Sequence, residues 1–370
     1  MSMLENSYQG KRVLVTGHTG FKGSWICEWL LALGADVTGY ALDPQPHELL
    51  YSQLGLGKRI SRDIRADLSD RSKLASEVAR LAPEIVLHLA AQPLVRLSYD
   101  IPVETFATNV MGTAHLLEAV RLSGHPCAVV AVTTDKCYDN REWLHAYREN
   151  DAMGGHDPYS ASKGAVELVI DSYRRSFFSE TAGVRLASAR AGNVIGGGDW
   201  AMDRIVPDCI RALRKNDEVL VRNKISTRPW QHVLEPLSGY LHLAACLASA
   251  PPTTNIMSLA SAFNFGPALS SNRTVAELVQ ELLKHTGGTW TDASDPLALH
   301  EASMLNLATD KAFHLLEWQP VWSFEQTLEK TAEWYLGEER GTSALELTRN
   351  QIFSYQNAAA VKGIPWSLSV

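Results

Sequence analysis

The sequence predicts an α/β fold, a doubly wound parallel sheet of the Rossmann type beside a smaller mixed α/β substrate domain. Three observations support this prediction. Short apolar runs typical of buried strands alternate with helical segments through the first half of the chain. A glycine-rich loop stands between the first apolar run and the first helix. After about residue 190 the alternation loosens, and Trp, Arg and Pro become frequent.

The first unit is a strand–helix–strand segment. Residues 11–16 read as a short buried strand, and residues 21–33 read as a helix with one apolar face. Residues 35–43 form the second predicted strand. A GxxGxxG loop joins the first strand to the helix. Such a loop lets the backbone approach a pyrophosphate closely and aims helix N-terminal amides at it, so the segment predicts a dinucleotide site.

The residues that would form this site are Gly17, Gly20 and Gly23, with Phe21 at the start of the helix. Asp43 follows the second strand and is a candidate to accept a hydrogen bond from the adenosine ribose. That contact would favour NAD over NADP. A plain turn role for Asp43 is an equally open interpretation.

Strands and helices continue to alternate after this unit. Further strands are predicted at 60–66, 84–91, 128–135 and 184–196, and helices up to about 81, at 101–122 and at 158–178. We expect an NAD-binding domain at 1–190 plus about 232–265, and a substrate domain at about 191–231 plus 266–370. A linker is predicted at 249–256, where the sequence reads SAPPTTNI.

Composition excludes several classes of protein. The net charge of −7 argues against a nucleic-acid partner, which would favour a basic surface. The five cysteines are scattered and form no CxxC pair, so neither a metal site nor a disulfide framework is expected. The N-terminus has no apolar signal segment, and no stretch is long and apolar enough to span a membrane. A cytoplasmic protein without a membrane partner is the expectation.

The segment Tyr-Ser-Ala-Ser-Lys places Tyr159 and Lys163 four residues apart, on one face of a helix that begins at Pro158. A phenol has a pKa of about 10 in water, too high for a base near neutrality. A neighbouring ammonium group favours the phenolate and lowers that pKa. The pair therefore reads as an acid/base device, although YxxxK alone is a weak signal.

The motifs TGHTGFKG, HLAAQ and YSASK, with Thr-Asp after the strand that ends near residue 134, resemble the extended short-chain dehydrogenase/reductase family over about residues 1–330. The resemblance implies that Tyr159 is the catalytic base and that Lys163 binds the nicotinamide ribose. It also implies that Asn109 supports a relay of lysine and water. The cofactor, NAD, would be contacted by Gly17, Gly20, Phe21, Gly23, Asp43, Asp67, Leu68, Ala90, Ala91, Asn109, Thr133, Tyr159 and Lys163.

A narrower resemblance concerns the sugar-nucleotide 4,6-dehydratases of that family. These carry Thr-Asp-Glu where this chain has Thr134-Asp135-Lys136. The strings GFKGSW, ARAGNVIGGGDWAMDRIVPD and RPWQHVLEP look like the branch that acts on CDP-glucose. The resemblance implies oxidation at carbon 4, loss of water across carbons 5 and 6, and return of hydride to carbon 6. NAD would stay tightly bound and be regenerated in each turnover.

In this reaction Thr134 would hydrogen-bond the sugar's 4-oxygen, and Asp135 would protonate the leaving 6-hydroxyl, for which burial must keep it protonated. A surface ion pair of Asp135 with Lys136 is the minority interpretation. Lys136 would act at carbon 5, either as a neutral base or as a cation that steadies the enolate. The sequence leaves both roles open.

A nucleotide diphosphate needs cations, and arginine suits phosphate oxygens. Five candidates occur between residues 190 and 228: Arg190, Arg204, Arg222, Lys224 and Arg228. The resemblance assigns the diphosphate to Arg228 and a substrate contact to Asn193. The full predicted substrate set is Gln92, Asn193, Arg204, Arg228 and Asn264. Lys22, in the glycine loop, either approaches a phosphate or faces solvent.

Two alternatives share this scaffold. A nucleotide-sugar 4-epimerase would keep Tyr159, Lys163 and NAD but would not need an acid and a base at 135 and 136. A non-catalytic NAD-sensing protein would show degenerate catalytic positions, whereas Thr134, Tyr159 and Lys163 are intact. The resemblance also implies a homodimer or homotetramer.

Overall fold

The computed structural model describes residues 1–178, 183–249, 256–294 and 304–369, and its centre is a seven-stranded parallel sheet. The strands lie in the order β11, β6, β5, β4, β1, β2, β3, and each neighbouring pair is parallel. Their bounds are β1 (Arg12–Thr16), β2 (Asp36–Ala41), β3 (Arg62–Arg65), β4 (Ile85–His88), β5 (Cys127–Val132), β6 (Val184–Ala191) and β11 (Ala262–Phe265). The predicted fold class is confirmed.

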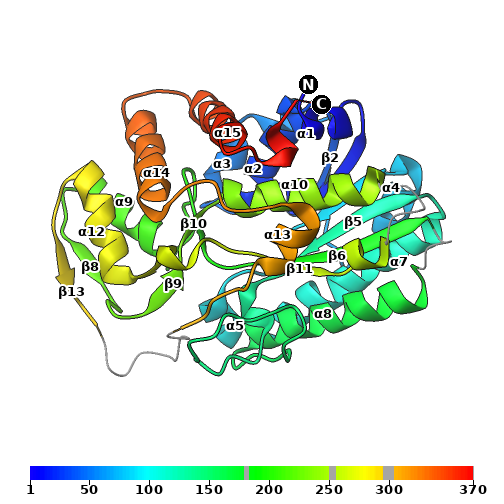
Figure 1. Ribbon diagram of the computed structural model, residues 1–370, viewed down its shortest axis with the longest axis horizontal. Helices are drawn as coiled ribbons and strands as arrows, with labels where there is room; N and C mark the ends of the chain where they lie inside the picture. Colours follow the sequence, from blue (N-terminus) through cyan, green and yellow to red (C-terminus); the bar gives the residue numbers. More distant parts are fainter. Residues whose placement is uncertain (179–182, 250–255, 295–303, 370) are drawn as a thin grey trace.

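Helices cover both faces of this sheet (Figure 1). One layer contains α1 (Met3–Tyr8), α2 (Phe21–Ala32), α10 (Leu234–Ser249) and α15 (Ala344–Val361). The other contains α4 (Arg71–Leu81), α7 (Gly112–Ser123) and α8 (Pro158–Ser176). Successive strand residues point to opposite faces. Val13 and Val15 of β1 therefore join the core around Trp25 and Trp29, whereas Leu14 joins the core under α4 and α7.

The helix predicted at 101–122 is interrupted by a change of winding. It runs as α6 (Pro102–Phe106), a π-helical segment η2 (Ala107–Met111) and α7. A π-helical turn displaces side chains from regular α-helical positions and is frequent at functional sites. Here it carries Asn109, which is 1% exposed. Two short helices complete this half of the chain. α3 (Leu49–Gln53) lies between β2 and β3 in the sequence, and α5 (Val95–Asp100) lies between β4 and α6.

The second half of the chain builds small sheets beyond the carboxyl ends of the large one (Figure 1). β7 (Val194–Ile195) pairs with β10 (Gln231–His232), and β8 (Val219–Val221) pairs with β13 (Trp290–Asp292), both in parallel; β9 (Thr227–Pro229) pairs with β12 (Asn272–Thr274) in antiparallel fashion. The helices of this half are α9 (Ile205–Arg214), α11 (Ile256–Leu259), α12 (Val275–Thr286), α13 (Asp310–Leu316) and α14 (Phe324–Glu339).

The segment 232–265 returns to the large sheet, since α10 packs against β5 and β11 pairs with β6. We propose the two-domain division predicted above, with one addition. α15 packs against α2 and α3 as well as α14, so the end of the chain bridges both domains. It reaches the first residues, where Ser2 bridges to Ser369 and the two termini lie together (Figure 1). The predicted linker 249–256 lies outside the described residues except for its two end positions.

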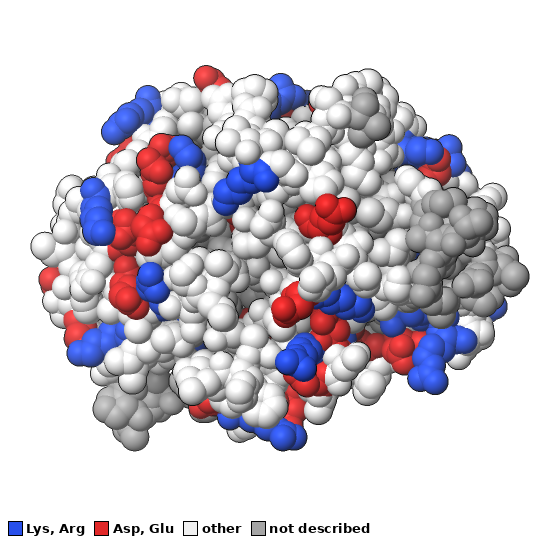
Figure 2. Space-filling model, viewed as in Figure 1, with Lys and Arg blue, Asp and Glu red and all other residues white. Residues whose placement is uncertain are grey.

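Charges are distributed rather than gathered on the face shown in Figure 2, where basic and acidic side chains alternate over the surface. Exposed charges of the molecule are often paired, as Arg222 is with Asp203 and Asp208, and Lys224 with Asp292. No helix in the described part of the chain combines the length and the apolar character needed to cross a membrane.

Candidate active site

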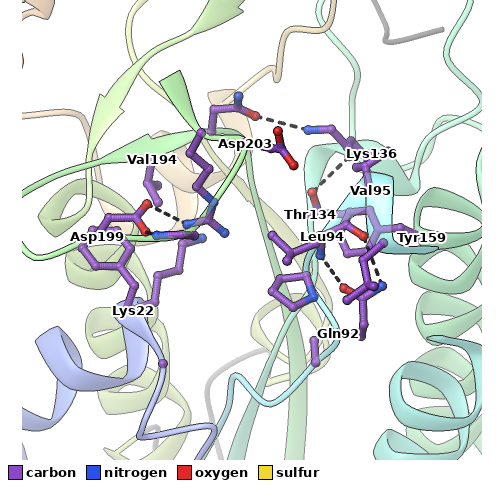
Figure 3. Close-up of a pocket in the computed structure, with 18 of the residues that line it drawn as sticks. Lys22, Gln92, Leu94, Val95, Thr134, Lys136, Tyr159, Val194, Asp199 and Asp203 are labelled. Atoms are coloured by element: carbon purple, nitrogen blue, oxygen red, sulfur yellow. Dashed lines mark hydrogen bonds and ion pairs between the residues drawn. The ribbon is translucent and has the colours of Figure 1, made fainter. Parts of the chain in front are cut away.

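A cavity of about 1320 Å³ lies at the carboxyl ends of β1, β2, β4, β5 and β6, where the two halves of the chain meet. In a doubly wound sheet this edge is the usual ligand site, at the point where the strand order reverses. That point here is between β1 and β4. Figure 3 shows Lys22 and Asp199 on one side of the cavity and Thr134, Lys136 and Tyr159 on the other.

The glycine loop lines this cavity, and two of its glycines, Gly17 and Gly23, have no room for a side chain. Gly17 has φ +73°, and a Cβ there would lie 2.7 Å from the backbone nitrogen of Ala90. At Gly23 a Cβ would lie 2.0 Å from the Gly17 carbonyl oxygen. Gly20 precedes α2 and caps it without a side chain, which leaves the first amides of the helix open to a ligand. These features fit the pyrophosphate of NAD.

The predicted adenosine contacts line the next part of the cavity. Asp43 follows β2 with its carboxylate 88% exposed, 3.9 Å from the Arg65 guanidinium. Asp67 and Leu68 follow β3 and also line the cavity, and the Asp67 carbonyl accepts a hydrogen bond of 3.0 Å from the Tyr40 hydroxyl. The structure therefore brings all three residues to the same end of the pocket.

Ala90, Ala91 and Gln92 follow β4 and line the middle of the cavity. Asn109 does not line it. Its amide accepts from the Gln92 backbone nitrogen at 2.8 Å and donates to the Gln92 carbonyl at 3.2 Å and to Ser162 at 2.8 Å. Asn109 thus connects the loop after β4 to α8 and positions Gln92, which lines the cavity, without lining the cavity itself.

Tyr159 and Lys163 occupy the first turns of α8. Asp157 caps this helix by accepting from the Ser160 backbone nitrogen, and Pro158 is its first residue. The Tyr159 side chain is 8% exposed and that of Lys163 is 5% exposed, yet both line the cavity. The Lys163 ammonium donates to the carbonyl of Val132, at the end of β5, at 3.4 Å.

Burial dominates the ionisation of this pair. It raises the pKa of Tyr159 well above its ordinary value. The neighbouring Thr134 hydroxyl and the charge of Arg204 act in the lowering direction, and Asp135 raises it further. Burial lowers the pKa of Lys163 to about 8, against the pull of Glu167. The sequence predicted that Lys163 would lower the pKa of Tyr159. In the protein alone, desolvation outweighs the effect of the neighbouring cations on the pKa of Tyr159. The positive charge of oxidised NAD, when bound, would act in the lowering direction and favour the phenolate.

Behind Lys163 lies a buried network centred on Glu167. Thr133 and Ser188 donate hydrogen bonds to its carboxylate, and Arg190 pairs with it at 2.9 Å. Arg190 also donates to the Tyr138 hydroxyl at 2.8 Å. The diphosphate role suggested for Arg190 is therefore wrong: it lies outside the cavity lining, and its charge is used in the core. Thr133 lines the cavity as predicted.

The Thr134-Asp135-Lys136 segment turns at the end of β5. The Thr134 hydroxyl donates to Asp135 Oδ1 at 2.9 Å and accepts from the Lys136 backbone nitrogen at 3.3 Å. The Lys136 ammonium lies 3.7 Å from Asp135 Oδ1 and donates to Asn193 Oδ1 at 3.2 Å. Asp135 is only 1% exposed, so its contact with Lys136 is no surface ion pair. Its second oxygen, Oδ2, has no hydrogen-bond partner.

Of the five cations predicted near a diphosphate, Arg204 and Arg228 line the cavity. Arg204 pairs with Asp199 at 2.7 Å and bears electrostatically on Tyr159. Arg228 is 8% exposed and donates to the Thr227 carbonyl at 2.8 Å. Arg222 and Lys224 are not part of the lining.

Lys22 is the residue whose place the sequence could not decide. It lines the cavity, with its ammonium 5.9 Å from the centre of the Tyr240 ring. Burial, and then the charge of Arg204, lower the pKa of Lys22 to about 7. The glycine motif indicated its loop but not its side-chain direction.

The substrate role predicted for Asn264 is wrong. Asn264 is fully buried in β11 and does not line the cavity. Its amide nitrogen donates to the carbonyls of Tyr147 and Ala308, and its oxygen accepts from the Tyr138 hydroxyl at 2.7 Å. These bonds join the sheet edge to two loops and use both N–H groups of the buried amide. Gln92 and Asn193 do line the cavity.

Comparisons with known proteins agree with this site. The chain matches the family described as GDP-mannose 4,6 dehydratase over residues 14–331. It is 48% identical to CDP-glucose 4,6-dehydratase of Salmonella typhimurium, over 96% of this chain and 98% of that protein. It is 26% identical to UDP-glucose 4-epimerase of Mycolicibacterium smegmatis, over 88% of this chain and 98% of that protein.

Two solved structures show the same architecture. One is a dTDP-glucose 4,6-dehydratase from Streptomyces venezuelae with NAD bound, which is 25% identical, covers 89% of this chain and 98% of its own, and has a TM-score of 0.74. The other is the UDP-glucose 4-epimerase of Thermotoga maritima, 22% identical over 89% of this chain and 99% of its own, with a TM-score of 0.75. The chain therefore belongs to the extended short-chain dehydrogenase/reductase family, within its group of nucleotide-sugar 4,6-dehydratases.

Proposed function

We propose that the protein is an NAD-dependent hydro-lyase that converts CDP-glucose to CDP-4-keto-6-deoxyglucose. The observation that carries the proposal is that Thr134, Lys136 and Tyr159 line one edge of the cavity, with Asp135 buried directly behind them and bonded to Thr134. The 48% identity to a CDP-glucose 4,6-dehydratase supports the same reaction and the cytidine nucleotide. NAD, when bound, accepts a hydride from carbon 4 and later gives it to carbon 6.

The protein's residues divide the proton chemistry. Tyr159 removes the proton of the 4-hydroxyl, and Thr134 holds the same oxygen. The resulting ketone acidifies carbon 5, where Lys136 acts. Asp135 protonates the departing 6-hydroxyl, and its buried Oδ2 has no hydrogen-bond partner in the described part of the protein. Arg204 and Arg228 would neutralise the diphosphate, with Asn193 and Gln92 at the sugar.

The experiment that tests this function is incubation with the glucose derivatives of CDP, UDP, dTDP and GDP, followed by mass analysis. Loss of one water from CDP-glucose is the expected result. No mass change, with conversion to the 4-epimer, would instead identify an epimerase. The structure favours dehydration because an epimerase has no use for a buried acid at Asp135 and an amine at Lys136.

Replacing Lys136 distinguishes its two proposed roles. In Lys136→Ala we expect dehydration to fall by about 10²–10⁴-fold, the usual contribution of one positioned acid or base. Exchange of the carbon 5 hydrogen with deuterated water should fall with it. Lys136→Arg is the matched variant, because arginine keeps the charge and cannot act as a base.

If Lys136 is the base, Lys136→Arg should lose dehydration and carbon 5 exchange to the same extent as Lys136→Ala. If Lys136 stabilises the enolate by its charge, Lys136→Arg should retain carbon 5 exchange. Normal carbon 5 exchange in Lys136→Ala would remove both roles.

We also propose a homodimer, or a homotetramer built from dimers. Large apolar side chains are exposed on α6, η2, α7 and α8 and just after α8: Val103, Phe106, Met111, Leu122, Leu168 and Phe177. Exposed apolar side chains on neighbouring helices are what a helix-to-helix contact between two copies would bury. Sedimentation should therefore give a multiple of the chain mass; a monomer at micromolar concentration would contradict this. The five free cysteines fit a reducing, cytoplasmic location.

A further inference from the structure

The proposed reaction, on which this inference rests, leaves two side chains with a changed number of protons after each turnover. Tyr159 gains the proton of the 4-hydroxyl and cannot return it to the sugar, because the product keeps its carbonyl at carbon 4. Asp135 gives a proton to the departing hydroxyl, which leaves as water. Lys136 ends the turnover with the protons it began with, because carbon 5 loses one proton and regains one. One proton must therefore move from Tyr159 to Asp135 before the next turnover.

The Thr134 hydroxyl lies between these two groups. It donates to Asp135 Oδ1 at 2.9 Å. It also lies beside Tyr159 at the cavity edge (Figure 3), where its hydroxyl acts to lower the pKa of the phenol. Its oxygen also accepts from the Lys136 backbone nitrogen at 3.3 Å. A hydroxyl has one proton and two lone pairs. The backbone amide fills one lone pair and the proton points to Asp135. The second lone pair can therefore accept from the sugar 4-hydroxyl while substrate is bound, and from the phenol once the product has left.

Tyr159 and Thr134 face the cavity, whereas Asp135 is buried behind them. The exposed fractions are 8% for Tyr159, 6% for Thr134 and 1% for Asp135. Lys136, the nearest ammonium at 3.7 Å from Asp135, is held by Asn193. Lys163 is directed to the Val132 carbonyl. A path through Thr134 is thus the shortest one that the described side chains provide.

We propose that Thr134 returns one proton from Tyr159 to Asp135 in every turnover. The phenolic O–H breaks as an O–H forms on Thr134, and the original Thr134 O–H breaks as one forms on Asp135. No electron is transferred and no outside acid is consumed. The enzyme returns to the state with a phenolate at Tyr159 and a protonated Asp135, ready for the next sugar.

The test compares the first turnover with later ones in Thr134→Val and Thr134→Ser, by rapid quench with CDP-glucose and the NAD-loaded enzyme. Valine has nearly the shape of threonine and no hydroxyl, whereas serine keeps the hydroxyl. In Thr134→Val the first turnover slows because the contact to the 4-oxygen is lost. We expect later turnovers to slow by at least about tenfold more, the low end of what a lost proton-transfer group costs.

The product should then appear as a burst of one per active site, followed by a slow phase that small buffer acids such as formate accelerate. Thr134→Ser should keep the wild-type ratio of first to later turnovers and show no buffer dependence. If Thr134→Val slows all turnovers by one factor, with no buffer effect, the proposal is overturned. Wild-type protein that forms no dehydrated sugar would refute the proposed function instead. Retained NAD binding and thermal unfolding temperature identify a folded variant.

Discussion

Tyr159→Phe is expected to lower the rate of CDP-glucose dehydration by about 10²–10⁴-fold, because it removes the group that takes the 4-hydroxyl proton. Without that transfer carbon 4 is not oxidised, and neither later step begins. The variant loses one buried hydroxyl and keeps the ring, so the fold and NAD binding should persist. The measurement is product formation by mass analysis, together with absorbance of reduced cofactor during a single turnover.

The matched control is Tyr173→Phe on the same helix α8. The Tyr173 hydroxyl contacts Glu118 at 3.4 Å, far along the helix from the cavity. This variant should retain wild-type activity, with stability changed by no more than about 0.5 kcal/mol. Full-rate dehydration by Tyr159→Phe would remove Tyr159 from the mechanism.

Asp135→Asn is expected to stop the reaction one step later. The amide keeps the size of the carboxyl group but cannot protonate the 6-hydroxyl, so overall turnover should fall by about 10²–10⁴-fold. Oxidation at carbon 4 should continue because Tyr159 and Thr134 are retained. We therefore expect reduced cofactor to accumulate without a dehydrated product, while carbon 5 exchange by Lys136 persists.

Asp171→Asn serves as the control, because Asp171 lies on α8 and pairs with Arg174 and Arg175 at the surface. It should leave turnover unchanged. Loss of cofactor reduction in Asp135→Asn to the same extent as loss of product would show that Asp135 serves the first step, contrary to its proposed role.

The sequence could place those parts of the candidate site whose residues lie close together along the chain. The glycine loop, the Tyr159–Lys163 pair and the Thr134-Asp135-Lys136 segment each follow a strand or begin a helix, so their positions follow from the order of elements. Parallel strands then bring their carboxyl ends to one edge. The fold class could be predicted for the same reason.

Side chains whose partners are distant in sequence could not be placed this way. Asn264 and Arg190 lie on adjacent strands. Both are bonded to buried partners instead of facing the cavity: each is hydrogen-bonded to Tyr138, and Arg190 also pairs with Glu167. Lys22 points into the cavity because α2 begins there, which its motif does not specify. The π-helical turn at Asn109 also has no signature in the local pattern.

The ionisation of Tyr159 shows why the local pattern was insufficient. The spacing to Lys163 predicted a lowered pKa, but burial, a property of the whole fold, raises it. Above a pH of about 8, Lys163 loses its own charge as well, because burial lowers its pKa to about 8. Activity that depends on the charged ammonium should therefore fall as the pH rises through that value.

The central claim is that hydride leaves carbon 4 of the sugar and returns to carbon 6 of the same molecule. CDP-glucose deuterated at carbon 4 tests it directly, with the product examined by NMR and mass analysis. The account predicts a dehydrated sugar that carries the deuterium on carbon 6. A dehydrated product without the label, or label returned only to carbon 4, would contradict it.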